Sequence, residues 1–222
     1  MLYAEIRDFA QRNTIINPGV DDIEPGGFVV FGDTRTNAGA HRNVVNAICG
    51  ESPAAAIHTG DIVEDGDSVS QWNTALEIQQ CLIAARRLWP ACGNHEGSGC
   101  TQNVIRDALG FHEDFYLVEL GGLTFIALNS ETVSNEQMAW LAALPTGKTY
   151  IPYFHHDPYP SIAGHGSDST VVRRFVPEFH RLGVKVVFNG HNHGYSRAEV
   201  DGIIYVTAGG GGAPLYPCGF PR

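Results

Sequence analysis

Basic residues are scarce in this chain. Its 222 residues include 14 Lys and Arg against 24 Asp and Glu, which gives a formal net charge of −10. A protein without a basic surface has no means of holding the backbone of a long nucleic acid or an anionic membrane by charge. We therefore expect no long nucleic acid among its partners. If the chain handles small anions, a bound cation has to supply the local positive charge.

Long apolar runs are also missing. No stretch approaches the about 20 apolar residues that cross a bilayer, so we expect no membrane insertion. The N-terminal segment mixes Glu5, Arg7 and Asp8 with apolar side chains. This pattern predicts a short amphipathic helix and lacks the apolar segment of a secretory signal. The expected location is cytoplasmic, or secreted or periplasmic if a signal has been removed.

Paired cysteine motifs are absent. The number of cysteines, five, is odd, and no CxxC pair occurs, which argues against a thiolate zinc site. Cys92 and Cys100 bracket a glycine-rich turn and are spaced to form a disulfide in an oxidising compartment. The alternative is that they are small core residues.

Short apolar runs, each followed by polar residues, recur along the chain. The runs cover residues 28–31, 54–57, 88–92, 150–154 and 184–188. They are β-prone and apolar on both faces, as the buried strands of an α/β sheet are. The polar residues that follow them are Asp33, Asp61, Asn94, the pair His155 and His156, and His191 with His193.

Helical patterns lie between these runs, at residues 40–49, 70–86, 136–143 and 171–182. Strands that alternate with helices pair in parallel, and such sheets bind ligands beyond the carboxyl ends of their strands. We therefore expect the five polar strand ends to converge on one crevice.

Other segments complete the expected α/β fold. Residues 115–129 predict a β-hairpin around Gly121-Gly122, and residues 203–208 predict a late strand. The glycine run 209–212 lacks the Lys-Ser/Thr of a phosphate-binding loop and predicts a flexible turn under the site. Residues 1–25 read as an N-terminal segment and linker, and residues 26–222 as one domain.

The polar strand ends offer oxygen and imidazole ligands without sulfur, a set that suits two cations such as Fe, Mn, Zn or Co. Two cations a few ångströms apart need a bridging carboxylate, which an Asp on a rigid turn can supply. Such a pair polarises a phosphoryl group and activates a water, so hydrolysis of a phosphate ester is the expected reaction.

At these positions the chain resembles the calcineurin-like metallophosphoesterase superfamily, whose signature strings are D-x-H, GD, GNH followed by Glu or Asp, a lone His, and GHxH. The order and spacing of the strings agree with the superfamily over residues 32–193. The matching strings here are Asp33-Thr34-Arg35, Gly60-Asp61, Gly93-Asn94-His95-Glu96, His155-His156 and Gly190-His191-Asn192-His193.

The resemblance implies a two-sheet β-sandwich flanked by helices, the four-layer fold of that superfamily. It also implies a binuclear-metal-dependent phosphoesterase that hydrolyses phosphomonoesters, phosphodiesters or both by attack of a metal-activated water on a small-molecule phosphate ester. Within the superfamily the chain is most similar to the purple acid phosphatase-like bacterial members. The segments that carry this similarity are 156–158, 161–166, 190–197 and 208–216.

The resemblance also implies roles for single residues. Asp61 bridges the two metals. Asn94, the histidine of 155–156 and His191 hold one metal, while Asp33 and His193 hold the other. His155 is favoured because it directly ends the strand, whereas His156 keeps the H-x-P spacing of the purple acid phosphatases. The predicted catalytic residues are His95, which lies over the substrate to protonate the leaving group or stabilise the transition state, and His165, which assists it.

Two positions depart from the superfamily pattern. Arg35 stands where D-x-H has its histidine, and an arginine does not ligate metals because it stays protonated. Glu64 stands where the purple acid phosphatases have a tyrosine. We expect a weaker first metal site, with Glu64 or water as the substitute ligand. Arg35 is expected either to contact the substrate phosphate, as a further catalytic residue, or to pair with nearby acids.

Two other functions fit the same sequence. One is a nuclease or cyclic-nucleotide phosphodiesterase on the same scaffold. The other is a non-catalytic binding module with a degraded first metal site, which Arg35 suggests. The number of metal ions per chain separates catalysis from the module.

Overall fold

The computed structural model describes residues 14–16, 27–96 and 114–217 and contains two β-sheets that face each other. The smaller sheet consists of β2 (Phe28–Phe31), β3 (Ala55–His58) and β4 (Leu88–Pro90), all parallel. Three of the predicted apolar runs form these strands, and the four residues of β3 are all buried.

The larger sheet has seven strands in the order β1-β5-β6-β7-β8-β10-β9. The strands are β1 (Thr14–Ile16), β5 (Tyr116–Leu120), β6 (Leu123–Ala127), β7 (Thr149–Tyr153), β8 (Val186–Asn189), β9 (Tyr195–Val200) and β10 (Ile203–Ala208). β6, β7, β8 and β10 run parallel, while β5 pairs antiparallel with β6 and β9 pairs antiparallel with β10. The hairpin predicted at 115–129 is therefore present as β5 and β6.

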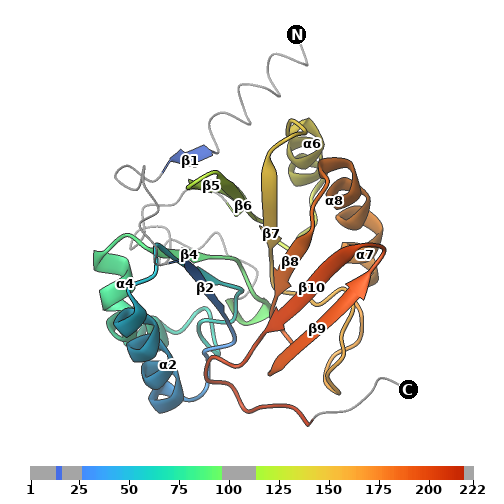
Figure 1. Cartoon of the computed structure of the whole chain (residues 1–222). Helices are drawn as coiled ribbons and strands as arrows, with labels where there is room; N and C mark the ends of the chain where they lie inside the picture. The colour runs from blue at the N-terminus through green and yellow to red at the C-terminus, as the bar shows by residue number, and fades with distance from the viewer. Residues whose placement is uncertain (1–13, 17–26, 97–113, 218–222) are drawn as a thin grey trace.

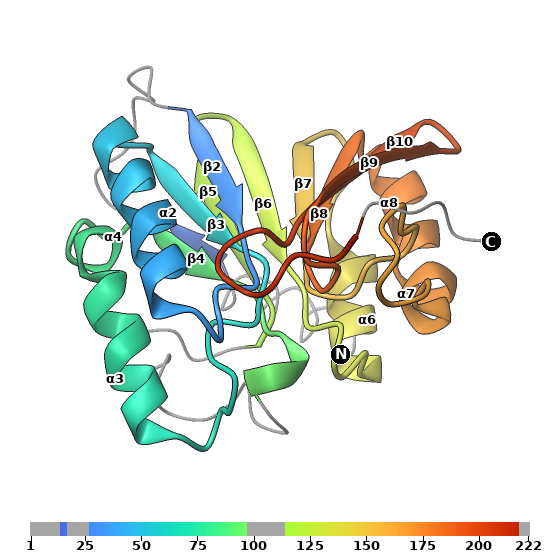
Figure 2. The ribbon, with the colours of Figure 1, turned by 90° about the horizontal axis from the view of Figure 1, so that it is seen from below.

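Helices cover the outer face of each sheet (Figures 1 and 2). α2 (Ala38–Glu51), α3 (Val69–Ile78) and α4 (Gln80–Ala84) lie beside the smaller sheet. α6 (Asn135–Ala143), α7 (Ser169–Arg174) and α8 (Val176–Leu182) lie beside the larger one. This order of helices, sheet, sheet and helices confirms the predicted α/β sandwich.

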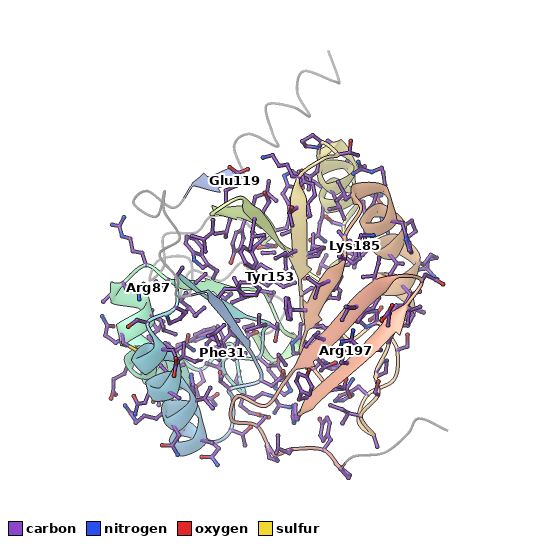
Figure 3. The ribbon with its side chains drawn as sticks, in the orientation of Figure 1. Phe31, Arg87, Glu119, Tyr153, Lys185 and Arg197 are labelled. Carbon is purple, nitrogen blue, oxygen red and sulfur yellow. A yellow bond between two sulfur atoms is a disulfide. The ribbon has the colours of Figure 1, made fainter. Side chains whose placement is uncertain are left out.

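Apolar side chains fill the space between the two sheets. Ile57 and Trp89 of the smaller sheet belong to one buried cluster with Phe125 and Tyr153 of the larger sheet. The ring of Phe28 meets the edge of Phe125 at a centroid distance of 4.9 Å. Figure 3 shows Tyr153 in this interior. The core holds the two sheets together, so the carboxyl ends of strands from both sheets open to the same side.

Three expectations about helices and strands differ from the structure. The segment 171–182 forms α7 and α8 instead of one helix, because Pro177 has no N–H to continue the first helix. The segment 70–86 is likewise divided into α3 and α4 at Gln79. β9 was not expected, although Asp201 and Gly202 both have positive φ and form the tight turn that joins it to β10.

The N-terminal part is described only at β1, which pairs in parallel with β5. The helix expected over the first eleven residues lies outside the described residues, and the boundary at residues 25 and 26 stays a prediction. Within the described part of the chain, no helix is long and apolar enough to cross a bilayer.

A disulfide that the sequence analysis did not predict joins Cys49 in α2 to Cys81 in α4. Cys92 is also disulfide-bonded. Its expected partner, Cys100, lies outside the described residues.

Candidate metal centre

The candidate ligands lie just beyond strands of both sheets. Asp33 follows β2, and Asp61 follows β3. His155 and His191 follow β7 and β8. Backbone hydrogen bonds join these ends: the N–H of Asp33 donates to Gly60 at 2.9 Å, and the N–H of His191 donates to the Asp33 carboxylate at 3.1 Å. The expectation that distant strand ends meet in one crevice agrees with this geometry.

Three of the candidate ligands have a left-handed backbone. The φ angle is 56° at Asp33, 59° at Asp61 and 68° at His191. This conformation is uncommon for residues other than glycine and costs about 1–3 kcal/mol each. The turns are tight because neighbouring segments touch them: a Cβ on Gly190 would lie 2.5 Å from Oδ2 of Asp33. Such strain is typical of functional sites.

One set of candidate ligands, here called the second-site group, consists of Asp61, Asn94, His155 and His191. His155 Nε2 lies 3.0 Å from Asn94 Oδ1, 3.1 Å from His191 Nδ1 and 3.4 Å from Asp61 Oδ1. His155 Nδ1 donates to the carbonyl of Thr59 at 2.9 Å, so Nε2 carries a lone pair.

These separations match neighbouring ligands around one cation, since metal–nitrogen bonds of about 2.1 Å at right angles place ligand atoms roughly 3 Å apart. Lone pairs that face one another have no hydrogen atom to share unless His191 Nδ1 supplies one. The second-site group therefore fits a cation.

The alternative motif-four histidine points elsewhere. His156 Nδ1 lies 3.1 Å from the Glu131 carboxylate and 3.3 Å from Ser130 Oγ. Its ring contacts that of His191 at a centroid distance of 4.5 Å. These contacts favour His155 as the ligand and place His156 beside it.

The remaining candidates, here called the first-site group, are Asp33, Asp61 and His193. Within the described residues, this is the group of three acidic or histidine side chains whose ligand atoms all lie within 4.8 Å of one another. Spacing alone would admit a cation. However, Arg35 already lies on two of the three: its Nε donates to Asp61 Oδ2 at 3.0 Å, and its Nη2 lies 3.3 Å from His193 Nε2. The first-site group does not fit a cation while Arg35 stays there.

Glu64, the predicted substitute ligand, faces Arg35. Its carboxylate accepts a short hydrogen bond from Nη1 of Arg35 and one from Thr36 Oγ1 at 2.8 Å. Arg35 thus pairs with both Asp61 and Glu64, as one of the two sequence alternatives expected.

The two predicted catalytic histidines flank the centre. His95 Nδ1 donates to the carbonyl of Glu64 at 2.8 Å, which leaves Nε2 facing the centre, 4.0 Å from Asp61 Oδ2. The His165 ring stacks on His191 at 3.9 Å, and its Nε2 lies 3.1 Å from the Tyr216 hydroxyl.

Burial sets the protonation of the histidine ligands. Burial lowers the pKa of His155 well below its ordinary value, and the nearby His156 lowers it further. Burial and then His155 lower the pKa of His191 to about 2. Neutral imidazole is the form that binds metals. In contrast, burial and then Asp61 raise the pKa of Asp33 well above the usual range. Without a cation, the first-site group thus resists a second buried negative charge.

Glu96 of the GNHE string supports the Asp61 turn, a role that the sequence analysis did not assign. Its carboxylate accepts hydrogen bonds from the N–H groups of Asp61, Ile62 and Gly93 at 2.7–2.9 Å and of Val63 at 3.3 Å. Burial and then Asp61 raise its pKa to about 8, against the opposing effect of the backbone donors. The position of Glu96 in the GNHE string was the only signal in the sequence that could have indicated this role.

The segment 209–216 passes over the first-site group and is bound to it. Gly211 donates to Gly32 and Ala213 donates to Asp33, both at 2.8 Å. A Cβ on Gly211 would lie 2.3 Å from the carbonyl oxygen of Gly32. The glycine run therefore permits close approach, and the expected flexible turn is instead held by hydrogen bonds.

Tyr216 ends this segment and was also missed as a site residue. Its ring stacks on His193 with centroids 4.2 Å apart, and its hydroxyl reaches His165. His193 Nδ1 donates to the carbonyl of Pro214 at 2.8 Å, so its Nε2 faces Arg35 with a lone pair.

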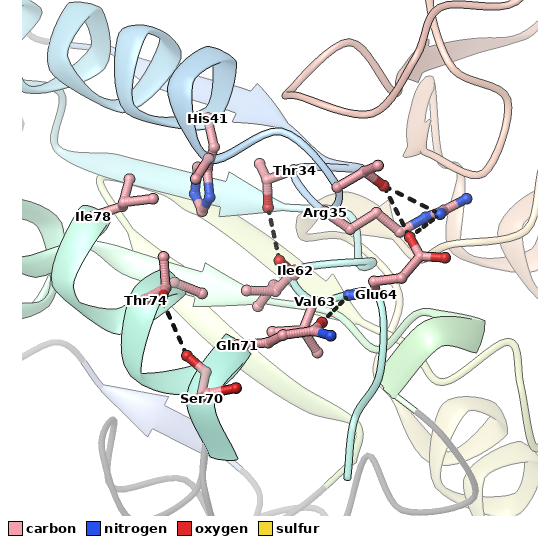
Figure 4. A pocket seen from close by; sticks show the side chains of 13 residues that line it. Thr34, Arg35, His41, Ile62, Val63, Glu64, Ser70, Gln71, Thr74 and Ile78 are labelled. Carbon is pink, nitrogen blue, oxygen red and sulfur yellow. Dashed lines mark hydrogen bonds and ion pairs between the residues drawn. The ribbon is translucent and has the colours of Figure 1, made fainter. Parts of the chain in front are cut away.

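A cavity of about 450 Å³ adjoins the centre at Arg35 and Glu64 and extends between α2 and α3 (Figure 4). Ile62, Val63 and Ile78 give it an apolar floor, and Thr74 borders it from α3. Its size suits a small molecule.

Comparisons with solved structures show related folds. A purple acid phosphatase from yellow lupin (Lupinus luteus) seeds is 18% identical with a TM-score of 0.65, and the match covers 88% of this chain. This chain spans about half, 46%, of that protein's length. A dimetal phosphatase from Danio rerio is 15% identical with a TM-score of 0.60, over 81% of this chain and 86% of that one.

GAP50, the anchor in the inner membrane complex of Plasmodium, is 14% identical with a TM-score of 0.68, over 88% of this chain and 75% of that one. At these identities the likeness establishes the fold. Comparison with curated proteins gave no match.

The family described as calcineurin-like phosphoesterase matches residues 27–195, which is more than half of the chain and includes every predicted metal ligand. The predicted superfamily is confirmed. The chain belongs to the calcineurin-like phosphoesterase family.

Proposed function

We propose that this chain hydrolyses small-molecule phosphate esters at a metal centre built on the second-site group. The observation that carries the proposal is the convergence on His155 Nε2 of Asn94 Oδ1, His191 Nδ1 and Asp61 Oδ1 at 3.0–3.4 Å. A cation bound there would polarise a phosphoryl oxygen and lower the pKa of a water molecule. Fe, Mn, Zn and Co all suit this donor set.

His95 is the residue that we propose to protonate the leaving oxygen. The Glu64 carbonyl accepts the Nδ1 hydrogen, which fixes the ring so that Nε2 faces the centre. A proton on Nε2 then lies where the ester oxygen departs. His165, which is stacked on His191, is placed to bind a phosphoryl oxygen.

The cavity beside Arg35 and Glu64 is proposed to take the organic part of the ester. Its volume of about 450 Å³ and the net charge of −10 favour a small molecule over a long nucleic acid. Monoesters, diesters and cyclic nucleotides all fit that description, and an activity assay distinguishes them.

The test is hydrolysis of p-nitrophenyl phosphate and of its bis ester by the metal-loaded protein, with His95→Ala as the comparison. We expect turnover of at least one ester by the wild type and a loss of about 100-fold or more in the variant. No turnover of either ester by metal-loaded wild type, or equal turnover by the variant, would overturn the proposal in favour of a binding module.

A secreted or periplasmic location is proposed in preference to the cytoplasmic one. The bond between Cys49 and Cys81 supports this choice, because disulfides persist in oxidising compartments and are rare in the cytosol. Free thiols at both positions in protein isolated from its native source under acid quench would contradict it.

A further inference from the structure

We propose that the guanidinium of Arg35 takes the place of the first cation, so that this chain operates with one metal ion. The inference rests on the proposed function but concerns the first-site group alone. It departs from the two-cation centre that the sequence analysis expects. Four contacts of Arg35 carry the argument.

The first two contacts occupy ligand atoms. Arg35 Nε donates to Asp61 Oδ2 at 3.0 Å, which takes up the carboxylate oxygen that a bridging role would give to the first cation. Arg35 Nη2 lies 3.3 Å from His193 Nε2. Because His193 Nδ1 already donates to Pro214, Nε2 accepts a hydrogen bond from the guanidinium.

The other two contacts hold the guanidinium in place. Arg35 Nη1 donates to the Glu64 carboxylate and lies 3.5 Å from Thr36 Oγ1, which itself donates to Glu64 at 2.8 Å. The Arg35 side chain is only 13% exposed. A cation entering the first-site group would have to displace a partly buried, hydrogen-bonded side chain that carries the same sign of charge.

The two departures from the superfamily pattern are therefore one feature. Arg35 and Glu64, noted separately in the sequence, form an ion pair beside the first-site group, and Figure 4 shows their two side chains together. Neither is left to ligate a metal: Arg35 stays protonated, and the Glu64 carboxylate is engaged by Arg35 and Thr36. Arg35 supplies a fixed positive charge beside Asp33 and Asp61, and Glu64 holds the guanidinium there.

A guanidinium and a metal ion neutralise charge alike but differ in chemistry. Arginine donates directed hydrogen bonds and cannot lower the pKa of a water molecule by coordination. In this arrangement Arg35 holds Asp61 and leaves an Nη2 hydrogen for a phosphoryl oxygen. Activation of the nucleophile falls entirely to the second-site group.

The test is a count of metal ions. Apo protein is titrated with Mn²⁺, followed by calorimetry and by electron paramagnetic resonance, without any substrate. We expect one ion per chain for the wild type, with the spectrum of an isolated ion. Two ions per wild-type chain, or an exchange-coupled spectrum, would overturn the inference.

The matched variant is Arg35→His, which restores the superfamily ligand. We expect it to bind two ions per chain with a coupled spectrum, and Arg35→His combined with Asp33→Asn to return to one. A folded Arg35→His protein that still binds one ion contradicts the inference. If that variant does not fold, His193→Ala alone decides: its affinity for Mn²⁺ should stay within about threefold of wild type, because the His193 ring contacts Arg35, Pro214 and Tyr216 rather than the ligands of the remaining ion, and a larger loss contradicts the inference.

The metal count is independent of turnover. One ion per chain without hydrolysis would remove the proposed function and leave this inference standing. Two ions per chain with hydrolysis would overturn this inference and leave the proposed function standing.

Discussion

On one side of Asp61, the side chains of Asn94, His155 and His191 turn lone pairs toward one another at 3.0–3.1 Å. On the other side, Asp61 and His193 turn theirs toward the guanidinium of Arg35 at 3.0 and 3.3 Å. The two sides use similar residue types and similar strand-end turns. They differ in whether a protein cation is already present, and we propose that this difference decides where a metal ion binds.

Removing one candidate ligand from each side should change the affinity for Mn²⁺, and we expect the largest effect of all the variants on one side and almost none on the other. His191→Ala is expected to weaken metal binding by more than about 100-fold, since losing partners outside the ligand shell already costs about 10–100-fold. His193→Ala, its matched control two residues away, should change the dissociation constant less than about threefold. Calorimetric titration with Mn²⁺ measures both. Equal losses of Mn²⁺ affinity in the two variants would contradict the proposed difference between the two sides of Asp61.

The histidines above the centre should differ in turnover without a change in metal content. His95→Ala is expected to lower kcat by about 100- to 10,000-fold, because it loses the group that faces the leaving oxygen. His165→Ala should lower kcat by less than about tenfold, because its ring lies against His191 and Tyr216. Steady-state kinetics with elemental analysis of each variant separates lost chemistry from lost metal.

The hydrogen bonds that Glu96 accepts from the Asp61 turn should contribute to the stability of the protein. Glu96→Gln weakens the bonds from four buried backbone N–H groups and is expected to lower the free energy of unfolding by about 1–3 kcal/mol. Glu136→Gln, an exposed change in the first turn of α6, should stay within about 0.5 kcal/mol. Urea denaturation measures both. An unchanged free energy of unfolding in Glu96→Gln would mean that the Asp61 turn does not depend on the Glu96 carboxylate.

The smallest effect is expected at the cavity. Thr74→Phe narrows it from α3 and should raise KM for p-nitrophenyl phosphate by about tenfold with kcat unchanged. Asn73→Phe, on the same helix but outside the cavity lining, should leave KM unchanged. If the two variants behave alike, the organic part of the ester binds elsewhere.

The sequence predicted the architecture well because its signals are local. Apolar runs such as 28–31 and 184–188 are followed by candidate ligand residues, and the structure places these runs at β2 and β8. β9 was not predicted because it carries no apolar run: its one buried residue is Ser196, and Arg197 and Glu199 are exposed. Pro177 already indicates in the sequence the division between α7 and α8.

The candidate site shows the limit of such reading. Motif order predicted the candidate ligands, but it could not tell His155 from His156, because that choice depends on the contacts of each ring with Asn94 or Glu131. The pairing of Arg35 with Glu64 joins residues 29 positions apart, and only the fold reveals it. The same holds for the bond between Cys49 and Cys81.

That bond has a thermodynamic consequence for the Asp61 turn. It closes a covalent ring, with a sequence separation of 32, that contains β3, the turn and α3. Closing a ring of this size lowers the conformational entropy of the unfolded chain, which raises the free energy of the unfolded state by about 4 kcal/mol. In the unfolded protein Asp61 therefore stays within a closed loop, which limits its distance from the other residues of that loop. Under reducing conditions the same segment becomes an open chain.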